Sequence, residues 1–147
     1  MGNIRTYTCM SKNHPFTPLL KCKYGFQTIF LNFSSENRFV GGTESGHVAI
    51  FNGNSIEKSV KLSKNSDQNK NATLARYSDG RIYAVAEDSS ITVLNMNLQI
   101  EKVFDQKVPD QIYAFVVTPY YVAVGGANGK VLVYDKSGDM LLVSFIL

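Results

Sequence analysis

The sequence predicts an all-β fold composed of about three similar four-stranded antiparallel sheets. The first observation is a repeated pattern of apolar run, tight turn and second apolar run at residues 39–52, 82–95 and 122–135. The second is that apolar residues in these runs lie on both faces of each predicted strand, which is typical of sheets covered on both sides. The third is that no window shows the 3.6-residue apolar period of an amphipathic helix.

The repeat has a regular spacing. When the three turns are superposed, so that Gly46, Ser89 and Gly129 coincide, the offsets are 43 and 40 residues, which is the period of a propeller blade. The strand after each turn has four columns of similar residues: Val48, Ile91 and Val131; Ile50, Val93 and Val133; Phe51, Leu94 and Tyr134; and Asn52, Asn95 and Asp135. Each repeat is therefore predicted to form one blade.

Further strands flank each turn pair. Runs rich in β-branched and aromatic residues precede it at 26–33, 71–77 and 111–118, and each is followed by a turn signal. A fourth run follows each pair, and the last one is "DMLLVSFIL". The predicted blades span about 26–62, 71–104 and 111–146, and residues 1–25 are expected to contribute to a further blade.

The sequence resembles the WD40 and quinoprotein-like family of β-propellers over about residues 26–147. The similarity is carried by "YVAVGGANGKVLVYDKSGDMLLVSF" (121–145), with "YD" where the family has Trp-Asp, and by "SDGRIYAVAEDSSITVLN" (78–95). The chain departs from the family pattern because it has no Trp and because Asn52 and Asn95 stand where an acid is expected. The resemblance implies a WD40-like β-propeller, here a partial ring of about three blades.

A partial ring has a physical consequence. Closed propellers usually have four to eight blades, so an arc of about three is expected to expose an apolar face at each end. Burial contributes roughly 25 cal/mol per Å², so an uncovered face of several hundred Å² forgoes on the order of 10 kcal/mol. The uncharged run "LLVSFIL" (141–147) points the same way. We therefore expect a protein partner, further chain or another copy to complete the propeller.

Composition limits the partner and the compartment. A net charge of +3, from 15 basic and 12 acidic residues, argues against nucleic acid as a direct ligand. The sequence has no apolar stretch of the roughly 18 residues that a membrane helix needs, and its start lacks the apolar core of a signal peptide. Only two cysteines are present, which favours a reducing compartment. We expect a soluble, cytoplasmic, eukaryotic protein.

No pattern predicts catalysis, a cofactor or a metal site. The "GGANGK" stretch lacks the phosphate-binding spacing and is predicted to be a hairpin turn. Cys9, His14 and Cys22 have no close pairing of the kind that zinc sites use. His47 follows a turn glycine and has no evident catalytic partner in sequence.

These observations predict a non-catalytic protein–protein interaction scaffold within an intracellular multiprotein complex. By the resemblance, the loops between blades share one rim with the central turn of each blade, and partners bind there. The residues predicted to contact a partner on this rim are Glu44, Lys64, Lys70, Glu87, Asp88, Lys107, Asp110 and Asn128.

Two alternatives remain open. One is a ligand-binding or enzymatic propeller of the quinoprotein type, which would need convergent acids, a metal or a cofactor at the centre of the ring. The other is an adaptor attached weakly to a membrane through N-myristoylated Gly2, because "MGNIRT" fits the acylation pattern.

Overall fold

The structure is a computed structural model, and it describes residues 3–4, 20–21, 28–35, 38–43, 46–52, 55–62, 74–85, 90–105, 112–126 and 129–145. Every regular element in these ranges is a β-strand. Near the amino terminus, β1 (Asn3–Ile4) pairs antiparallel with β2 (Leu20–Lys21). Within the described ranges, no helix has the length and hydropathy needed to cross a membrane.

The remaining strands form three antiparallel sheets of four strands each. The first sheet contains β3 (Thr28–Ser35), β4 (Arg38–Thr43), β5 (His47–Asn52) and β6 (Ser55–Lys61). The second contains β7 (Leu74–Ser78), β8 (Arg81–Val85), β9 (Ile91–Asn95) and β10 (Ile100–Val103). The third contains β11 (Ile112–Val117), β12 (Tyr121–Gly126), β13 (Lys130–Asp135) and β14 (Met140–Phe145).

Local sequence explains why these segments form hairpins. Their strands are rich in valine, isoleucine and aromatic residues, which suit a pleated surface packed on both sides. The β7–β8 turn consists of Asp79 (φ 51°) and Gly80 (φ 76°), between the paired residues Ser78 and Arg81. Positive φ at both central residues is the geometry of a two-residue turn whose twist matches that of the strands.

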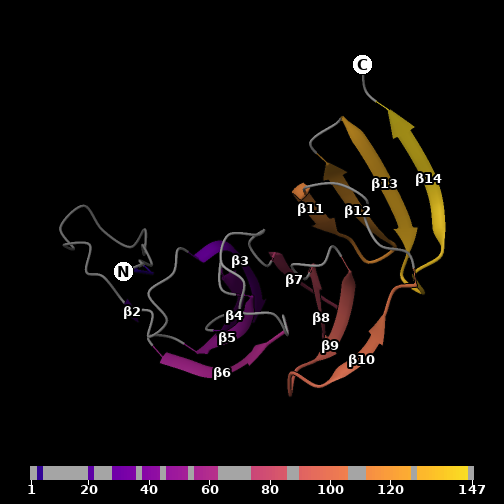
Figure 1. Ribbon diagram of the computed structural model, residues 1–147. Helices are drawn as coiled ribbons and strands as arrows, with labels where there is room; N and C mark the ends of the chain where they lie inside the picture. The colour runs from indigo at the N-terminus through magenta and orange to yellow at the C-terminus, as the bar shows by residue number, and fades with distance from the viewer. Residues whose placement is uncertain are drawn as a thin grey trace.

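The three sheets follow one another in an arc (Figure 1). In each sheet the strands pair in chain order, so β3, β7 and β11 are one edge strand and β6, β10 and β14 the other. Figure 1 shows β3, β7 and β11 on the inner side of the arc and β6, β10 and β14 on its outer side. Contacts of β7 with β3, β4 and β11 join the sheets. The predicted fold class, an all-β partial ring of three four-stranded antiparallel sheets, is confirmed.

Each junction between sheets contains a buried apolar cluster. Val40, Val48 and Ile50 of the first sheet pack against one face of the second, which includes Ile82 and Leu94. The opposite face of the second sheet, which includes Tyr83, Val85, Ile91 and Val93, packs against Phe115, Val122, Val124, Leu132 and Tyr134 of the third. We call the face turned toward the following sheet the forward face, and the opposite one the backward face.

The register of the sheets matches the repeat. Asn52, Asn95 and Asp135 pair with the first residues of β4, β8 and β12, which are Arg38, Arg81 and Tyr121. The aligned columns of the sequence therefore occupy equivalent positions in the three sheets. On the forward face, Val48 and Ile50 correspond to Ile91 and Val93, and to Val131 and Val133.

Candidate functional site

The rim residues predicted to contact a partner lie outside the residues that the structure describes, as do Gly2, Cys9, His14 and Cys22. His47, the first residue of β5, is partly buried. Burial and the positive charge of Lys61, its cross-strand partner, lower the pKa of His47. In the described part of the chain, no three His, Cys, Asp or Glu side chains gather as a metal site would require.

The aligned position at the end of β9 and β13 has a local role. The Oδ1 atom of Asn95 accepts hydrogen bonds from the backbone N–H groups of Asn97 (2.9 Å) and Gln99 (3.0 Å). Asp135 Oδ1 accepts equivalent bonds from Ser137 and Asp139, both at 2.9 Å. These side chains therefore fix the β9–β10 and β13–β14 turns, with either an amide or a carboxylate.

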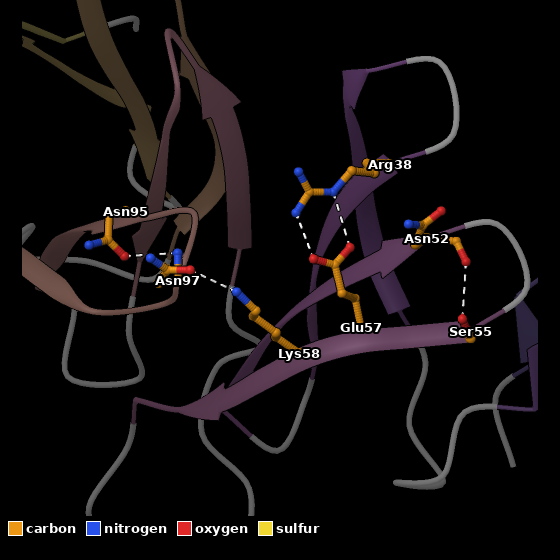
Figure 2. Close-up of polar contacts among 7 residues, drawn as sticks. All are labelled: Arg38, Asn52, Ser55, Glu57, Lys58, Asn95 and Asn97. Atoms are coloured by element: carbon orange, nitrogen blue, oxygen red, sulfur yellow. Dashed lines mark hydrogen bonds and ion pairs between the residues drawn. The ribbon is translucent and has the colours of Figure 1, made fainter.

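An ion pair recurs in the first two sheets. Arg38 donates to Glu57 over 2.8 and 3.1 Å, as Figure 2 shows, and Arg81 Nε lies 2.7 Å from Glu101. Both arginines begin the second strand of their sheet, and both glutamates occupy a bulge in the outer strand. The pair is thus a repeated feature of the sheet, although its exposure limits its contribution to stability.

A lysine follows each of these glutamates and connects neighbouring sheets. Lys58 Nζ donates to Asn97 Oδ1 in the β9–β10 turn over 2.8 Å (Figure 2). Lys102 donates to the backbone carbonyl of Ser137 in the β13–β14 turn. Since Lys58 pairs with Ile50 and Lys102 with Val93, the two lysines are equivalent by register. Each lysine therefore joins the outer strand of one sheet to a turn of the next sheet.

The third sheet lacks this charged set. At the positions of the arginine, glutamate and lysine it carries Tyr121, Leu141 and Leu142. Tyr121 is 50% exposed and Leu141 is 52% exposed. The repeated "IEK" at 56–58 and 100–102, replaced by "MLL" at 140–142, is the sequence signal that could have revealed the difference.

The forward face of the third sheet is an uncovered apolar surface. Its described members include Ala114, Val116, Tyr121, Ala123, Gly125, Val131 and Val133, together with the single acid Asp135. Val116 is 54% exposed, whereas the corresponding face of each preceding sheet is buried under the next sheet. Beside it, Tyr120 is 73% exposed and its ring centroid lies 6.2 Å from that of Tyr121. An exposed aromatic pair beside an apolar sheet is suited to binding protein.

The opposite end of the arc differs from the expectation. Phe39, Ala49 and Phe51, on the backward face of the first sheet, are buried, and the two phenylalanine rings stack at 5.1 Å. An apolar face is thus exposed at the third sheet, whereas the apolar residues at the opposite end of the arc are buried. These side chains are buried and Ile56 packs against them, so they are not available to an outside partner.

A lysine that sequence reasoning missed joins the second and third sheets. Lys136, in the β13–β14 turn, donates from Nζ to the Thr118 carbonyl (2.9 Å) and to Ser78 Oγ (3.0 Å). The same nitrogen lies 4.2 Å from the centroid of the Tyr83 ring. Burial lowers the pKa of Lys136. The Lys136 ammonium group is thus engaged in contacts at the junction of the second and third sheets.

No known family model matches this chain, and no curated protein shows significant sequence similarity to it. Solved structures do resemble it. The computationally designed Ika4 protein matches with a TM-score of 0.67 and 18% identity, over 87% of this chain and 79% of that one. The WD40 β-propeller domain of Doa1 matches with a TM-score of 0.64 and 15% identity, over 82% of this chain and 41% of that one.

BamB from Moraxella catarrhalis matches with a TM-score of 0.57 and 17% identity, over 80% of this chain and 37% of that one. The chain therefore spans about two fifths of the length of the Doa1 and BamB structures. Identities this low establish the fold and nothing beyond it. The chain is an arc of a β-propeller, with three of the sheets from which such rings are built.

Proposed function

We propose that this chain is a WD40-like propeller unit that acts as a non-catalytic interaction scaffold in an intracellular multiprotein complex. The observation that carries the proposal is the uncovered forward face of the third sheet, beside the exposed pair Tyr120 and Tyr121. Covering an apolar patch of a few hundred Å² would contribute on the order of 5–10 kcal/mol, before the cost of association. Burial of this face would therefore be one favourable contribution to a specific complex.

The structural relatives support a scaffold. They include the WD40 domain of Doa1 and a structure of BBS1N in complex with ARL6DN, the latter similar to this chain with a TM-score of 0.61 and 19% identity. The proposal includes blade boundaries at about 26–62, 71–104 and 111–146, with residues 1–25 in part of a further blade. The predicted rim residues, such as Glu44 and Asp110, would form a second contact.

The test compares two apolar-to-acid substitutions in the intact chain. Val116→Glu alters the forward face, whereas Ile100→Glu alters an equally exposed apolar side chain on β10, in the second sheet. Affinity capture from the source cell should recover a protein with the unmodified chain and with Ile100→Glu, and at least tenfold less of it with Val116→Glu. Recovery unaffected by Val116→Glu would reject the forward face as the binding surface.

A further inference from the structure

The forward faces of the three sheets can be compared position by position, because their registers are equivalent. Val40 and Ile50 in the first sheet correspond to Tyr83 and Val93 in the second, and all four are buried under the following sheet. In the third sheet the same positions hold Ala123 and Val133, both partly exposed. The third sheet therefore presents the surface on which a neighbouring sheet sits elsewhere in this molecule.

Side-chain size defines what could fill that surface. Relative to the second sheet, Tyr83 is replaced by Ala123, Val85 by Gly125, Ile91 by Val131 and Leu74 by Ala114. The third face is consequently shallower. Since protein interfaces pack at interior density, the covering surface must supply side chains at least as large as those that cover the second sheet.

The scarcity of charged side chains on the forward face of the third sheet restricts the covering surface further. Tyr121 and Leu141 replace the Arg–Glu pair, and Asp135, the one charged residue among the described positions of this face, is held by its own turn through Ser137 and Asp139. The outer strand β14 also has no charged residue, whereas β6 and β10 carry glutamate and lysine. A charged group seated here would be desolvated without a partner, so the covering surface is neutral.

A second copy of the chain fits poorly. The stacked Phe39 and Phe51 on the backward face of the first sheet have the required size, but both are buried. Packing two third sheets face to face would oppose small residues to small residues and leave the interface underfilled. The occupant is therefore a different surface.

We infer that the forward face of the third sheet is the seat for a β-sheet of a partner protein, whose facing side is neutral and carries large aliphatic or aromatic side chains. This inference rests on the proposed scaffold function and specifies its partner. The partner sheet takes the place of a following blade. Tyr121 and Leu141 contact it at the corner where the first two sheets form their ion pairs.

The experiment uses a sheet of suitable chemistry as the probe. In the intact chain with Cys9→Ser and Cys22→Ser, residues 105–147 are repeated directly after Leu147. The backward face of that added copy supplies the large neutral side chains Phe115, Leu132 and Tyr134. Val133→Cys in the original third sheet reports whether its forward face is covered, and Ile100→Cys reports on an exposed site elsewhere.

Alkylation of the thiol in the Val133→Cys variant is expected to slow at least tenfold when the added copy is present, whereas alkylation of the Ile100→Cys variant should keep its rate. Aspartate at the Val124 and Leu132 positions of the copy should restore fast alkylation of the Val133→Cys variant. An alkylation rate that the copy does not slow, whether or not the copy folds, would overturn the inference while leaving a face-dependent capture of partners intact.

Two further outcomes would also overturn the inference. Protection of the Val133→Cys thiol that rises with protein concentration in the absence of the added copy would show that a second molecule of this chain is the occupant. Protection of the same thiol by phosphatidylcholine vesicles would show that the face binds lipid instead of a partner sheet.

Discussion

At the scale of single residues, Gly138 fixes the contact between the second and third sheets. Its φ is +99°, and a Cβ placed there would lie 2.8 Å from Cδ1 of the buried Phe104. Gly138→Ala should therefore destabilise the protein by about 2–4 kcal/mol, through backbone strain and displacement of the ring. Denaturant unfolding followed by circular dichroism would measure this loss.

Gly80→Ala is the matched control for Gly138→Ala. Its φ is +76°, but nothing lies within 4 Å of the added Cβ. Only the backbone strain of a positive φ remains, so the free energy of unfolding should fall by about 1–2 kcal/mol. Equal losses for the two variants would show that the contact with Phe104 is not tight.

The Tyr134 hydroxyl is a second residue-scale feature. Tyr134 is fully buried, and its oxygen has no hydrogen-bond partner among the residues that the structure describes. Burial raises the pKa of this phenol. Because folding costs the hydroxyl its bonds to water, Tyr134→Phe should raise the free energy of unfolding by about 1 kcal/mol.

The control for Tyr134→Phe is Tyr120→Phe, since Tyr120 is 73% exposed and its hydroxyl stays in water. That variant should unfold at the same denaturant concentration as the unmodified chain. A loss of stability in Tyr134→Phe alone would reveal a hydrogen-bonded water or ligand at the phenol.

At the scale of elements, the turn residue Asp135 predicts an acid-dependent stability. Hydrogen bonds from the Ser137 side chain and from the Asp139 backbone lower the pKa of Asp135 from its ordinary 3.8. A carboxyl whose pKa is lower in the folded state stabilises the protein above the unfolded value, and that stabilisation is lost as the pH falls through the folded value. Acid unfolding should therefore depend partly on this group.

Asp135→Asn tests the charge alone, because Asn95 supports the equivalent turn through the same two backbone bonds. The variant should unfold like the parent near neutral pH, and its stability should fall less steeply from about pH 5 to about pH 3. Thermal unfolding as a function of pH measures both. An unchanged acid dependence would show that the charge of Asp135 contributes nothing to it.

The same elements show what sequence could predict. Period-two alternation and turn signals located the strands to within a few residues: the run predicted at 111–118 is β11 (Ile112–Val117), and that at 71–77 is β7 (Leu74–Ser78). The aligned columns became equivalent register positions because pairing of adjacent strands is a local property. Local pattern was sufficient for the arc of sheets.

The surface required more than local pattern. Arg38 meets Glu57 across an intervening strand and a bulge, so their pairing depends on a register that alternation does not determine. The burial of Phe51 likewise depends on what packs against its sheet. Consequently the sequence predicted that an apolar face would be exposed at an end of the arc, but not which residues form it. The uncharged corner at Tyr121 and Leu141 became visible only when equivalent positions in the three sheets were compared.

At the scale of the whole molecule, the arc is asymmetric: Phe39 and Phe51 at the backward end are buried, whereas Val116 and Tyr121 at the forward end are exposed. Replacing Tyr121 and Leu141 by arginine and glutamate would recreate the ion pair of the first two sheets. Because an exposed ion pair contributes about 0–1 kcal/mol, the double variant should unfold within about 1 kcal/mol of the parent. The substitutions should nevertheless weaken binding of a partner seated at this corner, since its apolar contacts with Tyr121 and Leu141 would be lost.

The measurements for this double variant are thermal unfolding, light scattering against protein concentration, and capture of partners from the source cell. Scattering should fall, because charges at an open sheet edge oppose association. Tyr121→Arg alone is the control, as it adds an unpaired charge and should reduce capture with a larger loss of stability. If the double variant unfolds at a much lower temperature than the parent, then Tyr121 and Leu141 stabilise the isolated chain. Their apolar character would then need no partner to explain it. If Tyr121 and Leu141 can be replaced by charged residues without loss of stability, the fold does not require apolar side chains at this corner. Binding of a partner then explains why the corner is apolar.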